Sequence, residues 1–332
     1  MKKDTVWKIL AVAAVFAGGL SVMPARFSSR PVLFSVPMGE GASAIARNLK
    51  AAGLIRSTTL FKAAVVLTGS RTGLKAGEYE IPASSNLWQV LFTLRSGKCL
   101  LHEFTVPPGF DALQIAGLLG QQKLANPAKF LALVRDRAFA HSLSVQASSL
   151  EGYLFPDTYQ IPRGFGSDRI LRLMVDRFRQ KVPDSLLEKG KAHGLSPYQV
   201  LILASLVERE ARLDSERPKV ASVFLNRLKK RMRLESCATV RYAMDKYTGP
   251  VTDKDLFFRS PYNTYRHRGL PPGPICSPGL KSIQAAVSPD KTPYLFFVVA
   301  GDGRQIFSQT FAEHVKAKLR YKAKLRAGIV QE

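Results

Sequence analysis

S-P-Y-N-T-Y-R-H-R-G-L-P-P-G, residues 260–273, is neither a helix nor a regular strand, because its prolines and glycines interrupt both hydrogen-bond patterns. We predict a loop of fixed shape. Its side chains Tyr262, Asn263 and Tyr265 combine aromatic faces with an amide, and we expect them to line a cleft for a sugar ligand. The alternative interpretation is a rigid surface turn.

A second informative segment is A-S-L-V-E-R-E-A at residues 204–211. It follows S-P-Y-Q at 196–199, which combines an N-cap serine, a first-turn proline and a capping-box glutamine. These signals predict a helix from residue 197 to about residue 213.

Two carboxylates on this helix, Glu208 and Glu210, point in directions about 200° apart. Glu210 shares its face with apolar residues at 203, 206 and 207, and desolvation there raises a carboxyl pKa. Glu208 can pair with Arg212 at i+4 spacing, which keeps it ionised. We therefore predict Glu210 as a general acid and Glu208 as a structural residue. The alternative is two ordinary surface glutamates.

The composition gives limits on class and partners. The chain has 332 residues, 46% of them hydrophobic, which is enough for two or three domains with real cores. Its net charge of +24 favours an anionic partner. The three cysteines Cys99, Cys237 and Cys276 and the scattered histidines match no metal-ligand spacing, and no nucleotide-binding motif occurs. We predict no metal and no cofactor.

The N-terminus indicates export. Residues 6–23 are apolar apart from Lys8 and Ser21, and Lys2 and Lys3 precede them. We predict a single-pass anchor in the plasma (inner) membrane, with residues 1–5 in the cytoplasm and the rest outside it. A cleaved signal peptide is the alternative. Either interpretation argues against a nucleic-acid partner despite the charge.

The remaining pattern predicts an α+β fold. Residues 32–103 indicate a compact module with the order strand, helix, helix, strand, followed by a further helix near 86–94. Residues 104–332 indicate a mixed α+β domain that ends in a strand at 294–300, a hairpin turn and a basic helix. The aromatic segment 149–159 predicts a second shaped loop.

Several strings resemble the YceG-like family of endolytic murein transglycosylases. They are E-G-Y-L-F-P-D-T-Y at 151–159, A-S-L-V-E-R-E-A at 204–211, S-E-R-P-K-V-A-S-V-F-L-N-R-L at 215–228, M-R-L-E-S at 232–236, S-P-Y-N-T-Y-R-H-R-G-L-P-P-G-P-I at 260–275 and K-T-P-Y-L-F-F-V at 291–298. Their order and spacing match the family from about residue 151 to residue 314.

The resemblance implies a fold, an activity and a site. It implies that residues 32–103 are a LysM-like glycan-binding domain and residues 104–332 the catalytic domain. It implies internal cleavage of peptidoglycan between N-acetylmuramic acid and N-acetylglucosamine without water, which leaves 1,6-anhydro ends. The essential acid falls on Glu210. We assign Glu151, Tyr153 and Glu235 to substrate binding. We assign Ser205 and Asn226, together with Glu208, to structural support.

The chain departs from the family pattern at several positions. Glu235 stands where the family usually has glutamine and Cys237 where it usually has aspartate. Gln305 stands where the family often has histidine, and Val315 where asparagine is usual. These changes keep a second interpretation open, a peptidoglycan-binding scaffold with weakened activity at the membrane. Glu235 and Asp214 remain candidates for a second acid, so hydrolysis also stays open. The family further implies peptidoglycan synthases as partners and the termination of nascent strands.

Overall fold

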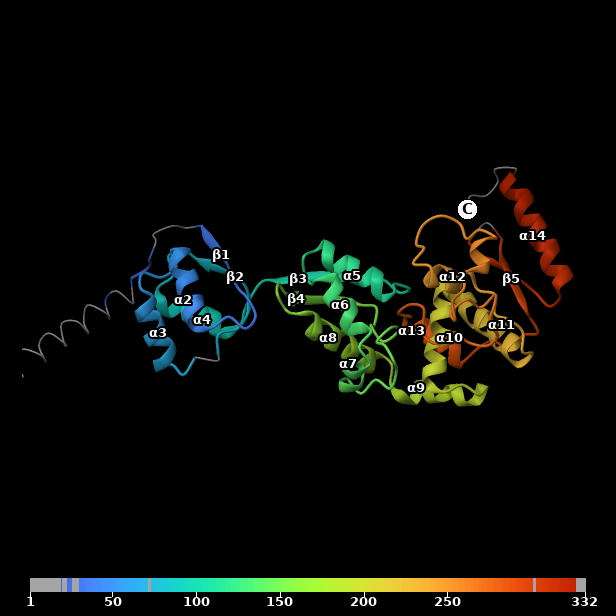
Figure 1. Cartoon of the computed structure of the whole chain (residues 1–332), viewed down its shortest axis with the longest axis horizontal. Coiled ribbons are helices and arrows are strands. Elements are labelled where there is room, and N and C mark those ends of the chain that lie inside the picture. Colours follow the sequence, from blue (N-terminus) through green and yellow to red (C-terminus); the bar gives the residue numbers. More distant parts are fainter. Residues whose placement is uncertain (1–18, 20–22, 26–29, 71–72, 301–302, 327–332) are drawn as a thin grey trace, which may run out of the picture. The chain divides into compact units, whose positions relative to one another are not determined.

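The computed structural model describes residues 19, 23–25, 30–70, 73–300 and 303–326 (Figure 1). The predicted cytoplasmic tail and nearly all of the predicted anchor lie outside these residues. Among the helices that the structure describes, none has both the length and the apolar character needed to cross a membrane. The fold is a mixed α+β arrangement of helices with three two-stranded sheets in the described residues.

The chain divides into two compact units. The first runs to Phe104 and also contains residues 121–125 and 159–166, whereas the second contains residues 105–120, 126–158 and 167–332. The domain boundary that we expect at residue 103 stays a prediction. The later segment 159–166 joins the first unit because the strand β4 (Thr158–Pro162) pairs with β3 (Leu101–Thr105) across more than fifty intervening residues.

The first unit has the predicted strand–helix–helix–strand order. The strands β1 (Pro31–Val36) and β2 (Gly77–Pro82) pair antiparallel, and the helices α2 (Ala42–Ala51) and α3 (Thr58–Leu67) connect them. The helix α4 (Leu87–Ser96) follows and begins with a capping box between Asn86 and Gln89, two hydrogen bonds of 2.9 Å each. Tyr79 on β2 is fully buried in the core that these elements share.

The second unit is built around α10 (Pro197–Glu210). Eight consecutive residues of this helix, 200–207, are buried, so the helix is surrounded by protein along most of its length. Its neighbours are α11 (Arg217–Lys229), α12 (Cys237–Ala243) and α13 (Leu280–Val287), which lie around it in Figure 1. The predicted capping box is confirmed, with bonds of 2.9 and 3.3 Å between Ser196 and Gln199.

The second unit contains further helices. They are α5 (Ala112–Gln121), α6 (Pro127–Val134), α7 (Arg137–Ser142), α8 (Ser167–Lys181), α9 (Asp184–Glu188), and the short 3-10 helices η1 (Lys189–His193), η2 (Asp214–Glu216) and η3 (Asp255–Phe257). The strands β5 (Phe296–Val299) and β6 (Gln305–Ser308) form the predicted antiparallel hairpin. The basic helix α14 (Phe311–Arg326) packs against both of these strands.

Candidate active site

Glu210 is the last residue of α10, three residues earlier than the predicted helix end. Ala211 takes an extended conformation, with φ −85° and ψ 117°, and stops the helix. This end leaves the carbonyl of Glu210 without a helical partner. The side chain of Gln305 on β6 donates to that carbonyl at 2.7 Å. The hairpin therefore fixes the end of α10 that carries the carboxylate.

The side chain of Glu210 opens into a cavity of about 540 Å³. The cavity lies between the end of α10, the start of α12, the β5–β6 hairpin and α14. Its lining combines aromatic and apolar groups with several cations, and the residues are Arg209, Glu210, Arg212, Arg227, Leu234, Glu235, Cys237, Tyr265, Phe297, Val298, Val299, Gln305, Phe311, His314 and Lys318. Such a cavity suits a sugar polymer that carries negative charge.

Burial raises the pKa of the Glu210 carboxyl, as the sequence predicted. Hydrogen bonds from the Ser236 hydroxyl and the Ala238 amide, and the charges of Arg209 and Arg227, act in the opposite direction. The desolvation effect is the largest of these. The carboxyl is therefore biased toward the protonated form that a general acid requires.

Ser236 orients this carboxyl, because its hydroxyl donates to Glu210 Oε1 at 2.5 Å. The serine is held in turn by two threonines. Its amide donates to Thr264 Oγ1 at 3.0 Å, and its carbonyl accepts from Thr239 Oγ1 at 2.7 Å. Ser236 is not among the predicted site residues and lies 26 residues from Glu210 along the chain. No periodicity or spacing in the sequence connects the two.

We expect Ser236→Ala to move the pH dependence of the reaction. The serine bond favours the ionised carboxylate, so its loss raises the pKa of Glu210 further. The fall of kcat/KM at high pH then shifts to higher pH, while the maximal rate decreases because the carboxyl is less well oriented. A pH–rate profile measures both effects, and Ser142→Ala, an exposed serine on α7, is the control. An unchanged profile would mean that this bond is irrelevant to the acid.

Glu208 has the structural surroundings that we expected, but with a different partner. Its side chain is 6% exposed and accepts from Arg217 at 3.0 Å and from the Gly279 amide at 2.9 Å. The predicted pairing with Arg212 is wrong, because α10 ends before residue 212 and the i+4 geometry does not continue. The carboxylate therefore ties α10 to the first turn of α11 and to the start of α13.

The loop at 260–273 is divided between separate places rather than lining one cleft. Tyr265 lines the Glu210 cavity, and its hydroxyl lies 3.0 Å from Cys237 Sγ. Asn263 is fully buried, and its amide donates to the carbonyls of Leu256 and Phe258 at 2.9 and 2.8 Å. The expectation that Asn263 contacts a sugar is therefore wrong. It shapes the loop instead.

Tyr262 and Glu151 line another cavity, of about 210 Å³, together with Asp111, Tyr242 and Tyr247. Glu151 is 7% exposed, and burial raises the pKa of its carboxyl to about 8, with the nearby Asp111 adding to the shift. Its Oε2 accepts from the Ala112 amide at 3.1 Å. Neither residue lines the cavity that contains Glu210.

We expect Glu151→Gln to make stability less dependent on pH. The folded state keeps this proton up to a pH of about 8, whereas the unfolded state loses it near the ordinary value of 4.5. The stabilising contribution of this bound proton is therefore complete below about pH 4.5, and it is lost as the pH rises from about 4.5 to about 8. The difference in Tm between wild type and variant across this range, with the exposed Asp253→Asn as control, measures the effect. A parallel pH dependence in both proteins would exclude a buried neutral Glu151.

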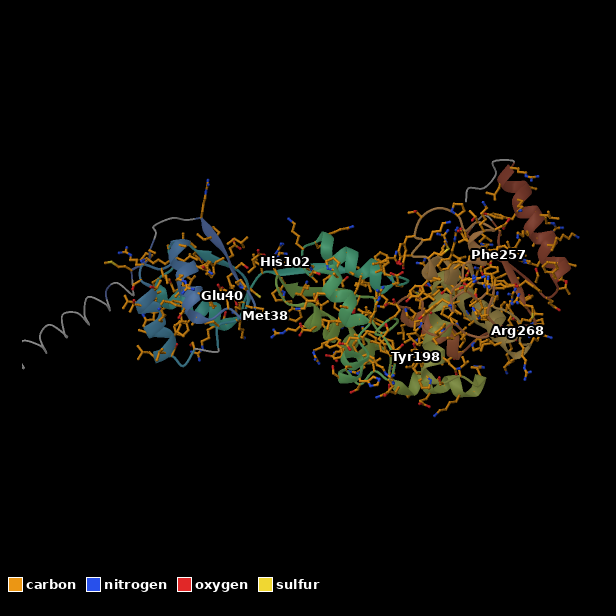
Figure 2. All side chains as sticks on the ribbon, viewed as in Figure 1. Met38, Glu40, His102, Tyr198, Phe257 and Arg268 are labelled. Carbon is orange, nitrogen blue, oxygen red and sulfur yellow. The ribbon has the colours of Figure 1, made fainter. Side chains whose placement is uncertain are left out.

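Three other predicted residues lie within the protein core or its edge. Tyr153 packs beside Phe178 and stacks 6.4 Å from the ring of Tyr198, which Figure 2 labels. Ser205 is fully buried; its hydroxyl donates to the Ile202 carbonyl and accepts from the Ile275 amide. Asn226 donates to the carbonyls of Thr292 and Tyr294 at 2.7 and 3.0 Å. Ser205 and Asn226 thus have the contacts expected of structural residues.

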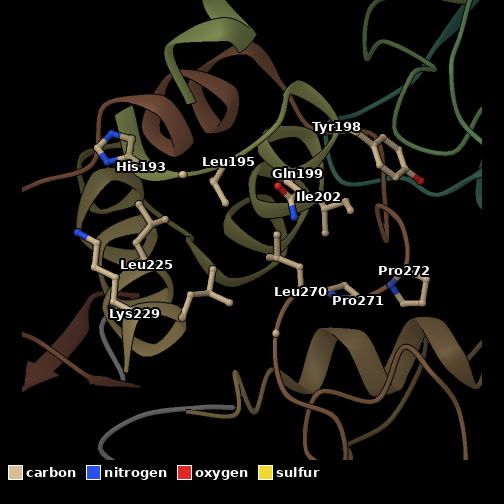
Figure 3. Close-up of a pocket in the computed structure, with 13 residues that line it drawn as sticks. His193, Leu195, Tyr198, Gln199, Ile202, Leu225, Lys229, Leu270, Pro271 and Pro272 are labelled. Carbon is tan, nitrogen blue, oxygen red and sulfur yellow. The ribbon is translucent and has the colours of Figure 1, made fainter. Parts of the chain in front are cut away.

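The proline end of the loop lines a third cavity, of about 550 Å³. Figure 3 shows Leu270 and Pro271 opposite Ile202 of α10, with Leu225 and Lys229 of α11 on another side. This cavity does not include Glu210. Of the loop 260–273, Tyr265 is the residue that lines the cavity of Glu210.

The two candidates for a second acid differ in their surroundings. Glu235 lines the Glu210 cavity and pairs with Arg227 at 3.1 Å. Asp214 does not line that cavity, and its pairs with Lys281 and Arg217 lower its pKa. An ionised, paired aspartate of this kind is not a proton donor. Within the described residues, no group of three or more His, Cys, Asp or Glu side chains is arranged to hold a metal ion.

Comparison with known proteins identifies the family. The model of the YceG-like family matches residues 34–320, which is most of the chain. The chain belongs to the YceG-like family. A crystal structure of a yceG-like protein from Listeria monocytogenes superimposes with a TM-score of 0.60 at 31% identity, covering 87% of this chain and 99% of that one.

Relatives with assigned names support the same grouping. A protein of Bacillus subtilis (strain 168) named endolytic murein transglycosylase is 34% identical over 330 residues, which is 94% of this chain and 91% of the relative. A protein of the same name from Streptococcus pneumoniae serotype 2 (strain D39 / NCTC 7466) is 30% identical and covers 90% of this chain. The chain spans 61% of the length of that pneumococcal relative.

Proposed function

We propose that this YceG-like protein is an endolytic lytic transglycosylase of peptidoglycan. It would cleave the bond between N-acetylmuramic acid and N-acetylglucosamine and leave 1,6-anhydro ends. The observation that carries the proposal is the Glu210 carboxyl, whose pKa is raised by burial and which faces a cavity of about 540 Å³. Relatives named endolytic murein transglycosylase support the substrate class.

The reaction needs one carboxyl that acts twice. Protonated Glu210 first gives its proton to the glycosidic oxygen, and the bond from that oxygen to C1 of the muramic acid breaks. The substrate's own acetamido group stabilises the oxocarbenium-like C1. Ionised Glu210 then removes the proton of the C6 hydroxyl, whose oxygen bonds to C1 and closes the anhydro ring. The carboxyl ends the cycle protonated, so no water is consumed.

The surroundings of Glu210 suit both halves of this cycle. Desolvation favours the protonated acid before the first transfer. Ser236 at 2.5 Å and the charge of Arg227 stabilise the carboxylate between the two transfers. Tyr265 and Phe297 in the cavity wall offer aromatic and apolar surface to a sugar ring. We assign these two residues to substrate contact, and we assign Ser236 to positioning.

Glu235 is the residue that could support ordinary hydrolysis, which uses two carboxyls. Its carboxylate pairs with Arg227 at 3.1 Å, and its side chain is 46% exposed. A paired, exposed carboxylate fits a role in binding or in holding Arg227. Cys237 stands at the position where the family usually has aspartate, and its thiol forms a hydrogen bond with the Tyr265 hydroxyl. Burial raises the pKa of the Glu210 carboxyl in the same cavity.

We further propose that the first unit is a LysM-like glycan-binding module and that residues 6–23 anchor the chain in the inner membrane. The strand–helix–helix–strand order of the module supports the first assignment. The apolar sequence after Lys2 and Lys3 supports the second. The catalytic unit would then act outside the cytoplasm on strands near the membrane, beside the synthases that make them, and would end nascent strands.

Digestion of purified peptidoglycan sacculi with the full-length protein tests the proposed activity. We expect soluble fragments with anhydro-muramyl ends, identified by their mass. Binding to sacculi without any fragment would replace the enzyme with a scaffold of weakened activity. Fragments with ordinary reducing ends would indicate a hydrolase on the same site.

A further inference from the structure

The helix α14 has one face against the protein and one face that is largely exposed. His314, Ala317 and Tyr321 lie on the inner face: the ring of His314 stacks 5.3 Å from Phe296, and Ala317 is 6% exposed. The inner face packs on the β5–β6 hairpin. Because α14 has 3.6 residues per turn, Val315 and Leu319 lie about 100° and about 140° around the helix from His314, on the outer side. Phe311 lies at the border of the two faces, where its ring is 5.9 Å from the ring of Phe296.

The outer face carries a stripe of exposed apolar side chains. Phe311 is 66% exposed, Val315 37% and Leu319 62%. Their i, i+4, i+8 spacing places them in one line along the helix. Single exposed apolar residues are ordinary on protein surfaces, whereas a continuous line on one helix face is typical of a contact surface.

Basic residues border this stripe on both sides. Lys316 and Arg320 lie on one flank, Lys318 and Lys322 lie on the other, and Arg326 continues the line. The single acid of the helix, Glu313, accepts from the amides of Gln309 and Thr310 at the helix start and is thus occupied in capping. The stripe is therefore apolar, and its border is cationic.

We propose that the outer face of α14 docks on the surface of an anionic phospholipid bilayer. The headgroup phosphates would pair with the basic border, and the acyl boundary would accept Phe311, Val315 and Leu319. An anionic polymer would satisfy the cations but not the apolar stripe. A second copy of this helix would place like charges opposite each other. The bilayer alone complements both properties.

This docking would also orient the candidate active site. Phe311, His314 and Lys318 of α14 line the Glu210 cavity as well, and β5 and β6 form another of its walls. A helix lying on the bilayer would hold the cavity close to the membrane surface. The binding itself does not depend on the proposed enzyme function, whereas this consequence for the site does.

The test uses the full-length chain with Leu319→Trp, mixed with vesicles of phosphatidylcholine alone or with phosphatidylglycerol, both carrying brominated acyl chains. Wild-type protein gives the background from Trp7 and Trp88. We expect the added tryptophan to be quenched in vesicle-bound protein when the lipid is anionic, and to be quenched much less when it is neutral. Quenching should decrease at high salt.

A pair of matched double variants separates this surface from general positive charge. In the Leu319→Trp protein, Lys316→Gln with Arg320→Gln should weaken docking about 30-fold and remove the quenching. Lys229→Gln with Lys230→Gln removes the same charge from the exposed C-terminal end of α11 and the residue after it. This double variant should leave the quenching intact. Vesicle-bound protein without quenching, absence from anionic vesicles, or equal effects of the two double variants would each overturn the proposal. Activity on sacculi without lipid tests the enzyme function separately.

Discussion

Glu210→Gln is expected to lower the rate of glycan cleavage by about 10²–10⁴-fold, the usual contribution of a positioned acid–base group. Glutamine keeps the size and the hydrogen bond from Ser236 but can neither donate the first proton nor accept the second. The variant should therefore keep its fold and its affinity for sacculi. Initial rates of fragment release, together with a sacculus pull-down, measure both properties.

The matched control is Glu235→Gln, which changes the other acid of the same cavity. Because Glu235 is 46% exposed and paired with Arg227, we expect its loss to affect binding more than turnover. Equal loss of kcat in the two variants would contradict a mechanism with one carboxyl. It would instead favour a hydrolase with two.

The largest expected effect on stability belongs to Glu208. Its carboxylate is 6% exposed and meets Arg217, itself 12% exposed, at 3.0 Å. Glu208→Ala removes the acceptor of the Gly279 amide and one partner of the partly buried Arg217 guanidinium, which keeps its bonds to Asp214 and Ser282. We expect a loss of about 1–3 kcal/mol in the free energy of unfolding, the usual cost of leaving a buried donor without its partner. Denaturant unfolding followed by circular dichroism measures it.

The control for this prediction is Glu188→Ala, which removes an ion pair with Lys191 on the surface of the same unit. Both side chains are well exposed, so the expected loss is only about 0–1 kcal/mol. A similar small loss for Glu208→Ala would mean that the carboxylate does not hold α10, α11 and α13 together.

Local signals in the sequence predicted much of the secondary structure. The capping box at Ser196 marked the start of α10, and Gly53 and Gly69, both with positive φ, follow the ends of α2 and α3. Other elements had no such signal. The helix α13 is only eight residues long and has no side-chain cap, although it packs directly against α10. The strand β4 depends on pairing with the distant β3.

The candidate site was predictable only in part. The raised pKa of Glu210 follows from its position on a helix that is apolar on nearly all sides. The division of the loop between two cavities could not be predicted from the sequence. Tyr262 and Tyr265 line different cavities, and Asn263 between them is buried. Ser236 and Gln305 contact Glu210 only through tertiary folding. Residues so far apart along the chain leave no spacing pattern to read.

Cleavage of sacculi in H₂¹⁸O most directly tests whether the carboxyl of Glu210 alone breaks the glycosidic bond without water. Mass spectrometry of the new muramyl ends distinguishes the two chemistries. If Glu210 acts as both acid and base, the ends carry no ¹⁸O and have the mass of the anhydro sugar. New ends that carry one ¹⁸O and a free reducing group would contradict the account, because water would then have attacked C1.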